Sequence, residues 1–359
     1  MGYARGSAAT GAGVVCEIHG MKRWRHRPEG SNWGEFGADD QRGRMNLLTP
    51  ARRLAAVREV REGLVFSLSL PLDYPGGPGL WETRAPPKLA ATRFRDGRSA
   101  YPFHMSSYAA PATDVICDDE VTLSLQYSTQ WDALAHCGSE FDADGDGAAE
   151  VVFYNGYRGG EHIASPDAAG GAGAGALGIE NLARAGVQGR GVLLDLYAEY
   201  GRKPARVGYE ALMRLMEQQS VEVGDGDFLC LYTGFADLVL AMRRQPDLRV
   251  LHGSCAGLDG RDEQLQRWIA DSGVVALCAD NAAVEATGDM GTGRAGRHAL
   301  LPLHELCLFK LGIHLAELWY FGELAPWLAA HRRNRFLLTA PPLDLPGAVG
   351  SPVTPLATV

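Results

Sequence analysis

The chain has 359 residues, of which 46% are hydrophobic and 21% are charged, and its formal net charge is −9. This composition is typical of a soluble globular protein with one large domain or two small ones. Because the balance is acidic and the basic residues are scattered, it excludes nucleic acid and an anionic membrane surface as partners.

The N-terminal region is predicted to run from a tail into a helix and a strand. The start MGYARGSAATGAG lacks the apolar core of a signal peptide, and we expect residues 1–20 to be disordered. Charged and apolar residues predict a helix over Pro50–Gly63, and Val65–Pro71 is typical of a strand. No apolar run approaches the roughly 20 residues of a membrane span. Seven scattered cysteines without a CxxC pair indicate buried thiols in a reducing compartment, so we expect a cytoplasmic protein.

Period-two alternation predicts a further strand over Val121–Gln130. In such a strand Gln126, Gln130 and the following Asp132 project from one side, and His136 comes where the chain turns away. The three polar groups could converge on one point. The same alternation is also expected of a strand with one solvated face, and the pattern alone leaves both interpretations open.

The next segment, FDADGDGAAE, is rich in Asp and Gly. Asp142, Asp144, Asp146 and Gly147 have the spacing that opens an EF-hand calcium loop. The twelfth position is Phe153, where such a loop carries a bidentate Glu, and a turn of this composition also forms without a metal. A calcium site and an ordinary turn are therefore both open.

Alternating strands and helices predict an α/β fold (mixed α+β) for the centre of the chain. Continuous apolar runs at Gly191–Asp195, Asp227–Tyr232 and Val274–Ala279 are typical of strands buried on both faces. Helices are predicted between them at Tyr209–Gln218 and Arg261–Asp271.

Two flanking segments have compositions unsuited to a core. The Gly/Ala-rich segment Ser165–Gly178 is expected to be a linker or a mobile lid. The Pro-rich tail 339–359 is expected to wrap a surface or a partner subunit. Asp280 and Asn281 end an apolar strand, where side chains serve either a functional site or a cap.

The segment QYSTQWDALAH, Gln126–His136, resembles the H-x-G-T-H-x-D-x-x-x-H motif of the metal-dependent cyclase family, which includes bacterial kynurenine formamidase and isatin hydrolase. Other segments resemble that family in the same order: WGEFGADDQRGRMNLLTP, GRGVLLDL, GDGDFLCLYTGF, VVALCADNAAVEA and HELCLFKLGIHLAEL. The resemblance runs from about Trp33 to about Leu324.

The resemblance implies a single cyclase-like catalytic domain over 21–338, of the swivelling β/β/α type, in a homodimer or larger homo-oligomer. It implies a hydrolase or cyclase that acts on an amide, lactam or lactone bond of a small cyclic or aromatic molecule. The metal-binding aspartate of the family falls on Asp132, its third histidine on His136, and its late pair on His304 and Glu317. Its first two histidines fall on Gln126 and Gln130.

The late pair cannot share one face of a helix, because the two positions are 13 apart in sequence and so about 140° apart around an ideal helix. Either His304 precedes the helix, just after Pro302, or Gly312 interrupts it. His298 is an alternative to His304, and His314 is expected on the surface of that helix.

The two glutamines change the expected metal, because an amide oxygen replaces an imidazole nitrogen at each position. A site of Asp132, His304, Glu317 and the two amide oxygens is oxygen-rich, which suits manganese or magnesium better than zinc. The cofactor is therefore expected to be a divalent ion, manganese, zinc or magnesium, or to be absent.

Without a metal, both amides would polarise a substrate carbonyl while His136 transfers a proton and Asp132 orients it. The chain would then be a metal-free cyclase or dehydratase of a biosynthetic pathway, and a non-enzymatic binding protein is the third interpretation. The residues expected to contact substrate are Gln126, Gln130, Trp131, Tyr154 and Asn155. Cys137 is excluded as a nucleophile, because adjacent residues such as His136 and Cys137 point apart.

Overall fold

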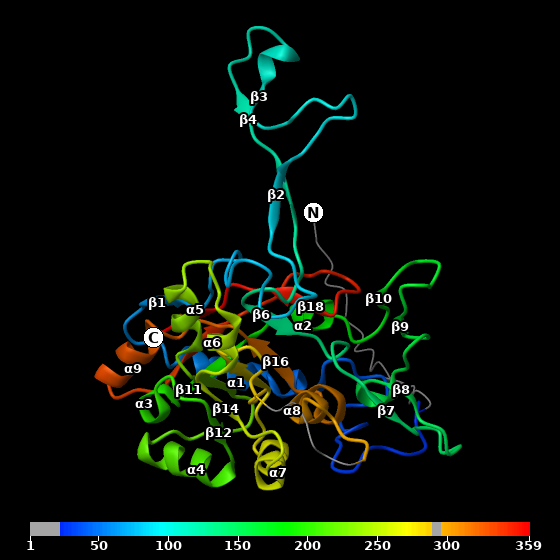
Figure 1. Ribbon diagram of the computed structural model, residues 1–359, viewed down its shortest axis with the longest axis vertical. Coiled ribbons are helices and arrows are strands. Elements are labelled where there is room, and N and C mark those ends of the chain that lie inside the picture. Colours follow the sequence, from blue (N-terminus) through cyan, green and yellow to red (C-terminus); the bar gives the residue numbers. More distant parts are fainter. Residues whose placement is uncertain (1–21, 289–295) are drawn as a thin grey trace, which may run out of the picture.

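The computed structural model describes residues 22–288 and 296–359 (Figure 1), so the predicted tail at 1–20 lies outside the described residues. Its centre is a nine-stranded sheet in the order β1-β19-β17-β11-β13-β15-β16-β6-β18. Strands β11, β13, β15 and β16 are parallel, and every other neighbouring pair is antiparallel. The strands are β1 (Val65–Ser67), β6 (Gln130–Asp132), β11 (Gln188–Asp195), β13 (Phe228–Tyr232), β15 (Ala276–Ala279), β16 (His314–Glu317), β17 (Arg335–Thr339), β18 (Gly350–Pro352) and β19 (Leu356–Thr358).

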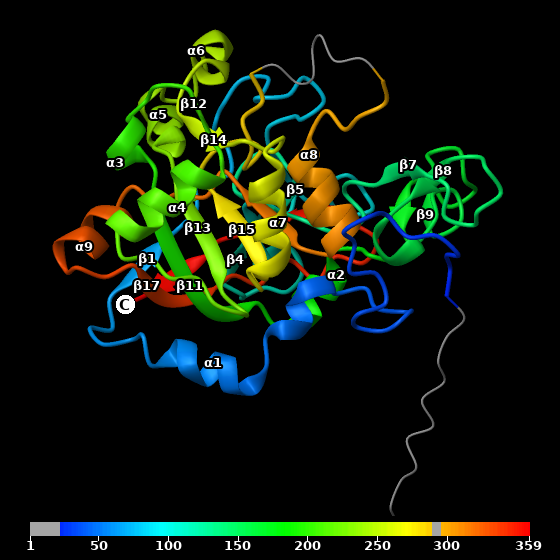
Figure 2. The same cartoon turned by 90° about the horizontal axis from the view of Figure 1, so that it is seen from below.

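Helices cover both faces of this sheet. Figure 2 shows α4 and α7 in front of β13 and β15, and their buried side chains join the core on that face. The other face packs against α2 and α9. The α-helices are α1 (Pro50–Val57), α2 (Glu180–Ala185), α3 (Tyr197–Tyr200), α4 (Tyr209–Gln218), α5 (Phe235–Ala241), α6 (Leu248–His252), α7 (Glu263–Asp271), α8 (Pro302–His304) and α9 (Leu324–Ala330). A π-helix at Glu305–Leu311 continues α8, and short 3-10 helices lie at Gly43–Leu47, Met105–Ser107 and Tyr154–Gly156.

The buried parallel strands follow from their sequence. In β11 the side chains of Val192 and Leu194 pack on one face, while Leu193 packs on the other. Alternate residues of a strand point to opposite faces, so a continuous apolar run fills both layers. The expected α/β arrangement, with strands buried on both faces at the centre of the chain, is thereby confirmed.

The predicted strand over Val121–Gln130 is wrong. Strand β5 (Asp119–Thr122) ends just after its first residues, and β6 begins only at Gln130. The two strands bond to different partners, because β5 pairs with β2 (Lys88–Ala91) while β6 lies between β16 and β18. The intervening residues turn from one sheet into the other.

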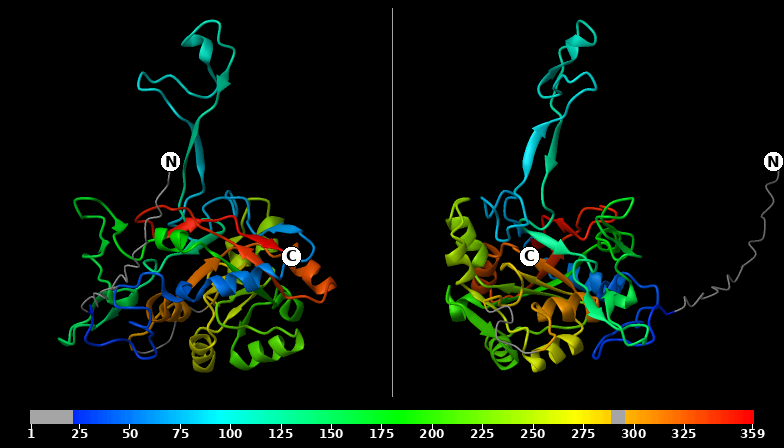
Figure 3. Two further views of the ribbon diagram at one scale, coloured as in Figure 1. Left: turned by 180° about the vertical axis from the view of Figure 1, so that it is seen from behind. Right: turned by 45° about the vertical axis from the view of Figure 1, so that its right-hand side comes forward.

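Strands β2 and β5 belong to a long projection that stands away from the body of the molecule (Figures 1 and 3). Its outer end holds a second ladder, between β3 (Phe103–His104) and β4 (Val115–Ile116). We call residues 86–123 the arm. Three further two-stranded ladders decorate the body, formed by β7 (Ser139–Phe141) with β8 (Glu150–Val152), β9 (Ile163–Ala164) with β10 (Gly173–Ala174), and β12 (Ala205–Val207) with β14 (Ala256–Leu258).

The two segments expected to lie outside the core both contribute to it. Ala174, Ala176 and Leu177 of the Gly/Ala-rich segment are buried in the main core cluster. Residues 339–359 supply β18 and β19 of the central sheet, where their backbone groups find ladder partners. The six described cysteines are free thiols, of which Cys117 is exposed. None of the described helices combines the length and hydropathy needed to cross a bilayer.

Candidate active site

A buried polar cluster lies where β6 and β16 run side by side. Gln130 is paired with Glu317 and Asp132 with Leu315, which places Gln130, Asp132 and Glu317 on one face of the sheet. All three side chains are buried. The Gln130 amide nitrogen donates to Glu317 Oε2 at 2.9 Å and to Asp132 Oδ1 at 3.2 Å. One amide group therefore bridges two buried carboxylates.

The late pair is brought together by a helix end and a strand. His304 is the last residue of α8, and the helical segment that follows ends at Gly312, whose φ of 59° lies in the left-handed region. The chain then forms β16, so Glu317 lies on a strand rather than on the expected helix. His304 Nε2 is 3.2 Å from Glu317 Oε1.

Glu285 is a further member of the cluster that the sequence analysis did not identify. Its Oε1 lies 2.9 Å from His304 Nδ1, and its carboxylate accepts hydrogen bonds from the backbone N–H groups of Leu303 and His304. The only signal in the sequence is a lone carboxylate in the otherwise apolar segment AAVEA. A carboxylate in this position fixes the ring orientation and tautomer of the histidine.

The geometry of the cluster fits a divalent cation. Single ligand atoms of Asp132, His304 and Glu317 lie within 4.8 Å of one another. Asp132 Oδ2 accepts no hydrogen bond and Glu317 Oε1 has only the His304 imidazole beside it, while the unpartnered Gln130 Oε1 would face these groups only if the amide turned over. Carboxylates, an amide oxygen and one imidazole together suit manganese or magnesium, and they also admit zinc.

Burial and neighbouring charges set the protonation of the cluster. Burial lowers the pKa of His304, but its hydrogen bonds with Glu285 and Glu317 outweigh burial and raise this pKa to about 10. Burial, and then the negative charge of Asp132, raise the pKa of Glu317 to about 7. The His304 imidazole is therefore protonated at neutral pH, and the Glu317 carboxyl is protonated in part.

His136 lies at the edge of the cluster, with its side chain 23% exposed. Its Nε2 is 3.9 Å from Asp132 Oδ1, and its Nδ1 is 3.5 Å from the amide nitrogen of Gln126. Burial lowers the pKa of His136, and the nearby Asp132 carboxylate only partly offsets this. A neutral imidazole beside a carboxylate can accept a proton.

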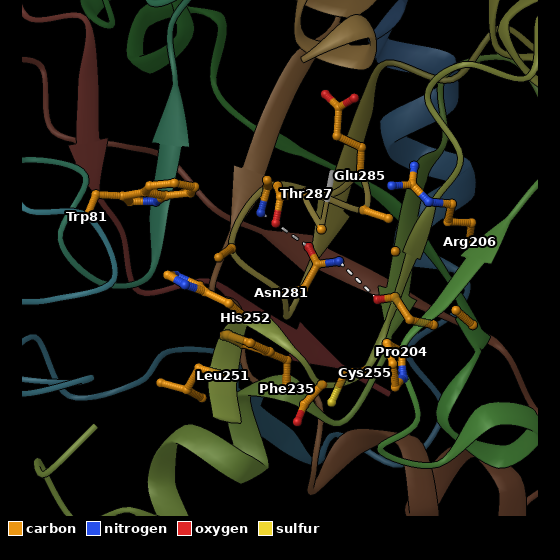
Figure 4. A pocket seen from close by; sticks show the side chains of 18 residues that line it. Trp81, Pro204, Arg206, Phe235, Leu251, His252, Cys255, Asn281, Glu285 and Thr287 are labelled. Carbon is orange, nitrogen blue, oxygen red and sulfur yellow. Dashed lines mark hydrogen bonds between the residues drawn. The ribbon is translucent and has the colours of Figure 1, made fainter. Parts of the chain in front are cut away.

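A cavity of about 240 Å³ opens onto these groups, with His136, His304 and Glu317 in its wall together with Trp81 and Arg84. A second cavity of about 230 Å³ shares Trp81, Ala282 and Ala283 with it. Figure 4 shows this second cavity, with Trp81 and His252 on one side and Arg206 on the other. Glu285 lines the second cavity and also bonds to His304 in the wall of the first.

The structure does not bring Trp131, Tyr154 and Asn155 to the cluster. Trp131 points to the opposite face of β6, where its Nε1 donates to Ala340 O and its ring packs against Trp319. Tyr154 is buried in the core, and the Asn155 amide donates to three carbonyl oxygens in residues 37–40. These contacts hold the N-terminal loop against the body.

The remaining histidines also differ from expectation. His298 lies outside the cluster, where its Nδ1 contacts Gly296 O. His314 was expected on a helix surface, but it is buried in β16 because Gly312 ends the helix before it. Burial without a charged neighbour lowers the pKa of His314 to about 3.

The other candidate polar groups have local structural partners. The Asp280 carboxylate accepts hydrogen bonds from the backbone N–H groups of Thr233 and Gly234 at the start of α5. Asn281 bonds to the backbone around Ala256 and Val284. Carboxylate oxygens of the predicted calcium loop also lie within 4.8 Å of one another, but the loop's own backbone N–H groups donate to them: Asp142, Asp144 and Asp146.

Comparisons with known proteins show the family and the fold of the chain. The cyclase family, described as "Putative cyclase", matches residues 66–286. A solved structure described as a novel cyclase is 31% identical over 92% of this chain and 97% of that chain, with a TM-score of 0.70. Isatin hydrolase A from Ralstonia solanacearum is 16% identical over 86% of this chain and 97% of that chain, with a TM-score of 0.51. An isatin hydrolase bound to the product analogue thioisatinate is 14% identical over 87% and 99%, with a TM-score of 0.52, and both hydrolases share the fold. No curated protein sequence matches the chain.

Proposed function

Because the chain belongs to the cyclase family, we propose that it is an enzyme that hydrolyses, or in reverse closes, an amide, lactam or lactone bond of a small cyclic or aromatic molecule. One observation carries this proposal: the buried side chains of Asp132, His304 and Glu317 lie together, next to the partly exposed His136. Burying charged groups costs folding free energy. Such groups therefore gather mainly at functional sites, and here they meet at a cavity.

His136 and Asp132 are the proposed catalytic residues. His136 faces the cavity, and its neutral imidazole would take the proton from an attacking water and return it to the leaving nitrogen or oxygen. Asp132 Oδ1 lies 3.9 Å from His136 Nε2, and its charge would stabilise the imidazolium that forms, while a shorter contact would be needed for it to orient the ring. The Gln126 amide, on the other side of the ring, restrains its position.

Asp132, His304 and Glu317 are the proposed ligands of a manganese, zinc or magnesium ion. Gln130 would join them if its amide turned over to present the oxygen, and Glu285 would hold the His304 ring in the tautomer that frees Nε2. A bound divalent ion would supply Lewis-acid polarisation of the substrate carbonyl.

A metal-free cyclase or dehydratase is the second candidate, and one observation favours it. The Gln130 amide nitrogen already donates to one oxygen of Asp132 and one of Glu317, which partly compensates both carboxylates without a cation. In that case the protonated His304 supplies the positive charge of the cluster, and the Gln126 amide, rather than the engaged Gln130 amide, would polarise the substrate carbonyl.

We propose that the substrate spans the two adjoining cavities. The reacting carbonyl would occupy the cavity at His136, and the remainder of the molecule would extend past Trp81 toward Phe235 in the second cavity. The aromatic rings of this wall suit an aromatic or cyclic substrate. We also propose that the enzyme is cytoplasmic and acts as a homo-oligomer.

Turnover of a panel of aryl formamides, lactams and lactones tests the proposal, with chelator-treated protein assayed alone and after addition of manganese or zinc. His136→Ala and Asp132→Ala should each lower the rate about 10²- to 10⁴-fold. The exposed His331→Ala provides the matched control and should retain the rate. Unchanged rates in both site variants would contradict the catalytic assignment and favour a non-enzymatic binding protein.

The metal content of protein purified without chelator separates the two candidate functions. About one equivalent of a divalent ion supports the metal-dependent enzyme, because a preformed ligand set should retain its metal. Less than about a tenth of an equivalent, with turnover that manganese and zinc do not increase, supports the metal-free enzyme.

A further inference from the structure

The first cavity, of about 240 Å³, has two carboxylates beside the place proposed for the reacting carbonyl. Glu317 lines this cavity, and Asp132 Oδ1 lies 3.9 Å from His136 Nε2. Attack of water on a carbonyl carbon moves negative charge onto the carbonyl oxygen, and nearby carboxylates repel that charge. The reaction therefore needs a positive charge that faces this oxygen.

Three described residues of the cavity wall are able to carry a positive charge: Arg84, His136 and His304. His304 is engaged at both ring nitrogens, because Nδ1 lies 2.9 Å from Glu285 Oε1 and Nε2 lies 3.2 Å from Glu317 Oε1. Burial lowers the pKa of His136, and its proposed role as a base also requires the neutral ring. Of the lining residues that the structure describes, Arg84 is thus the charged group that still has donors to offer.

Arg84 is held in place without being neutralised. Its backbone N–H donates to Trp81 O at 3.0 Å, and its guanidinium carbon lies 6.0 Å from the centre of the Trp81 ring. Its Nη1 donates to Gln126 O at 2.8 Å. The other N–H groups of the guanidinium have no partner in the part of the chain that the structure describes, and no carboxylate there pairs with it.

Gln126 connects Arg84 to the proposed base. The backbone carbonyl of Gln126 accepts the hydrogen bond from Arg84, and its side-chain amide nitrogen lies 3.5 Å from His136 Nδ1. Arg84 and His136 also line the same small cavity. One carbonyl group can therefore present its oxygen to the guanidinium and its carbon to a water beside His136.

We propose that Arg84 is a further catalytic residue, whose guanidinium donates to the carbonyl oxygen of the bond that is cleaved. As the water oxygen bonds to the carbonyl carbon, the water proton passes to His136, and the C=O π electron pair moves to the oxygen that faces Arg84. When this pair returns, the bond to the leaving nitrogen or oxygen breaks, and His136 returns the proton to that atom. The role of Arg84 rests on the proposed function and is the same with or without a bound divalent ion.

Turnover by the full chain tests this role, with the substrate that the panel of formamides, lactams and lactones identifies. Arg84→Gln should lower kcat about 10²- to 10³-fold, as expected when one donor to such an oxygen is lost, while KM stays nearly unchanged. Arg84→Lys keeps a positive charge and should retain more of the rate than Arg84→Gln. Arg267→Gln changes an exposed arginine of α7 that pairs with Glu263, so it is the matched control and should retain the rate.

A substrate with sulfur in place of the carbonyl oxygen tests which atom Arg84 contacts. Sulfur is a weaker hydrogen-bond acceptor than oxygen. The preference for the oxygen substrate over the sulfur substrate should be larger in the wild type than in Arg84→Gln, because only the wild type loses the guanidinium contact when the atom changes. A purely structural role of Arg84 would lower both rates by the same factor. Circular dichroism of each variant shows whether the protein is folded.

Equal turnover by the wild type and Arg84→Gln, with an impaired His136→Ala, would overturn the role of Arg84 and leave the proposed function standing. The same preference for oxygen over sulfur in both proteins would overturn the direct contact. Burial, and to a smaller extent the charge of Arg84, lowers the pKa of His136. A loss of rate in Arg84→Gln that disappears at about pH 9 would therefore mean that Arg84 acts only through His136, which would also overturn the contact. If the wild type turns over no member of the panel, the proposed function fails and the role of Arg84 fails with it.

Discussion

The bridging amide of Gln130 allows a direct test of how the buried carboxylates are neutralised. In Gln130→Leu the volume of the side chain is largely kept, but both N–H donors to Asp132 and Glu317 are lost. A hydrogen bond to a charged group contributes about 1.5 to 3 kcal/mol. Because the bond to Asp132 is long at 3.2 Å, we take the lower end for each bond. Chelator-treated Gln130→Leu should therefore lose about 3 kcal/mol of unfolding free energy.

Urea unfolding followed by fluorescence measures this loss, in chelator and again with excess manganese or zinc. Gln126→Leu is the matched control, because the Gln126 amide contacts only the edge of His136 at 3.5 Å and should cost about 1 kcal/mol or less. Excess metal should narrow the gap between the variants, since a cation then neutralises the carboxylates in place of the amide. If Gln130→Leu in chelator loses no more free energy than Gln126→Leu, the bridging role of Gln130 is refuted.

Two further predictions follow from buried groups. Glu285→Gln removes the carboxylate at His304 Nδ1 and should lower manganese or zinc affinity about 10- to 100-fold, measured by competition with a fluorescent chelator; unchanged affinity would exclude Glu285 as an orienting group. Folding lowers the pKa of His314 from an ordinary value near 6.5 to about 3. As pH falls below about 6.5, the unfolded chain takes up a proton at His314 that the folded protein does not, so the free energy of unfolding decreases. His314 alone should cost about 2 kcal/mol of unfolding free energy between pH 7.5 and pH 5, and His314→Leu should remove that part of the pH dependence. An identical pH dependence in the two proteins, measured by urea unfolding, would count against a buried neutral imidazole.

The sheet could be predicted because its signals are local. Continuous apolar runs marked β11, β13 and β15, and the helical period marked α4 with the same bounds as observed. The strand at 121–130 was wrong because alternation continues through residues that pair with two different sheets. Sequence alternation cannot show which partner a strand meets.

The sequence could predict only those site residues that belong to the family motifs. Asp132, His304 and Glu317 meet as the family resemblance implies. Glu285 was missed because its partner is 19 residues away and its position depends on how the loop after β15 folds against α8. Trp131 sits beside two site residues in sequence, yet strand geometry turns its ring into the core.

The charge of the buried cluster explains why a metal and the Gln130 amide are competing solutions to one problem. Asp132, Glu285 and Glu317 bring three carboxylates together, and the His304 imidazolium balances only one of them. Burying the remaining negative charge is unfavourable, and the raised pKa of Glu317 reflects that cost. A divalent cation bound in place of the proton on His304 Nε2 would halve this deficit, whereas the Gln130 amide lowers the cost only through two neutral donors. A neutral histidine at position 130 would offer at most one N–H to the two carboxylates, whereas glutamine offers two. The Gln130 amide can therefore stabilise the carboxylates when no metal is bound. If the amide turned over, its oxygen could become a metal ligand.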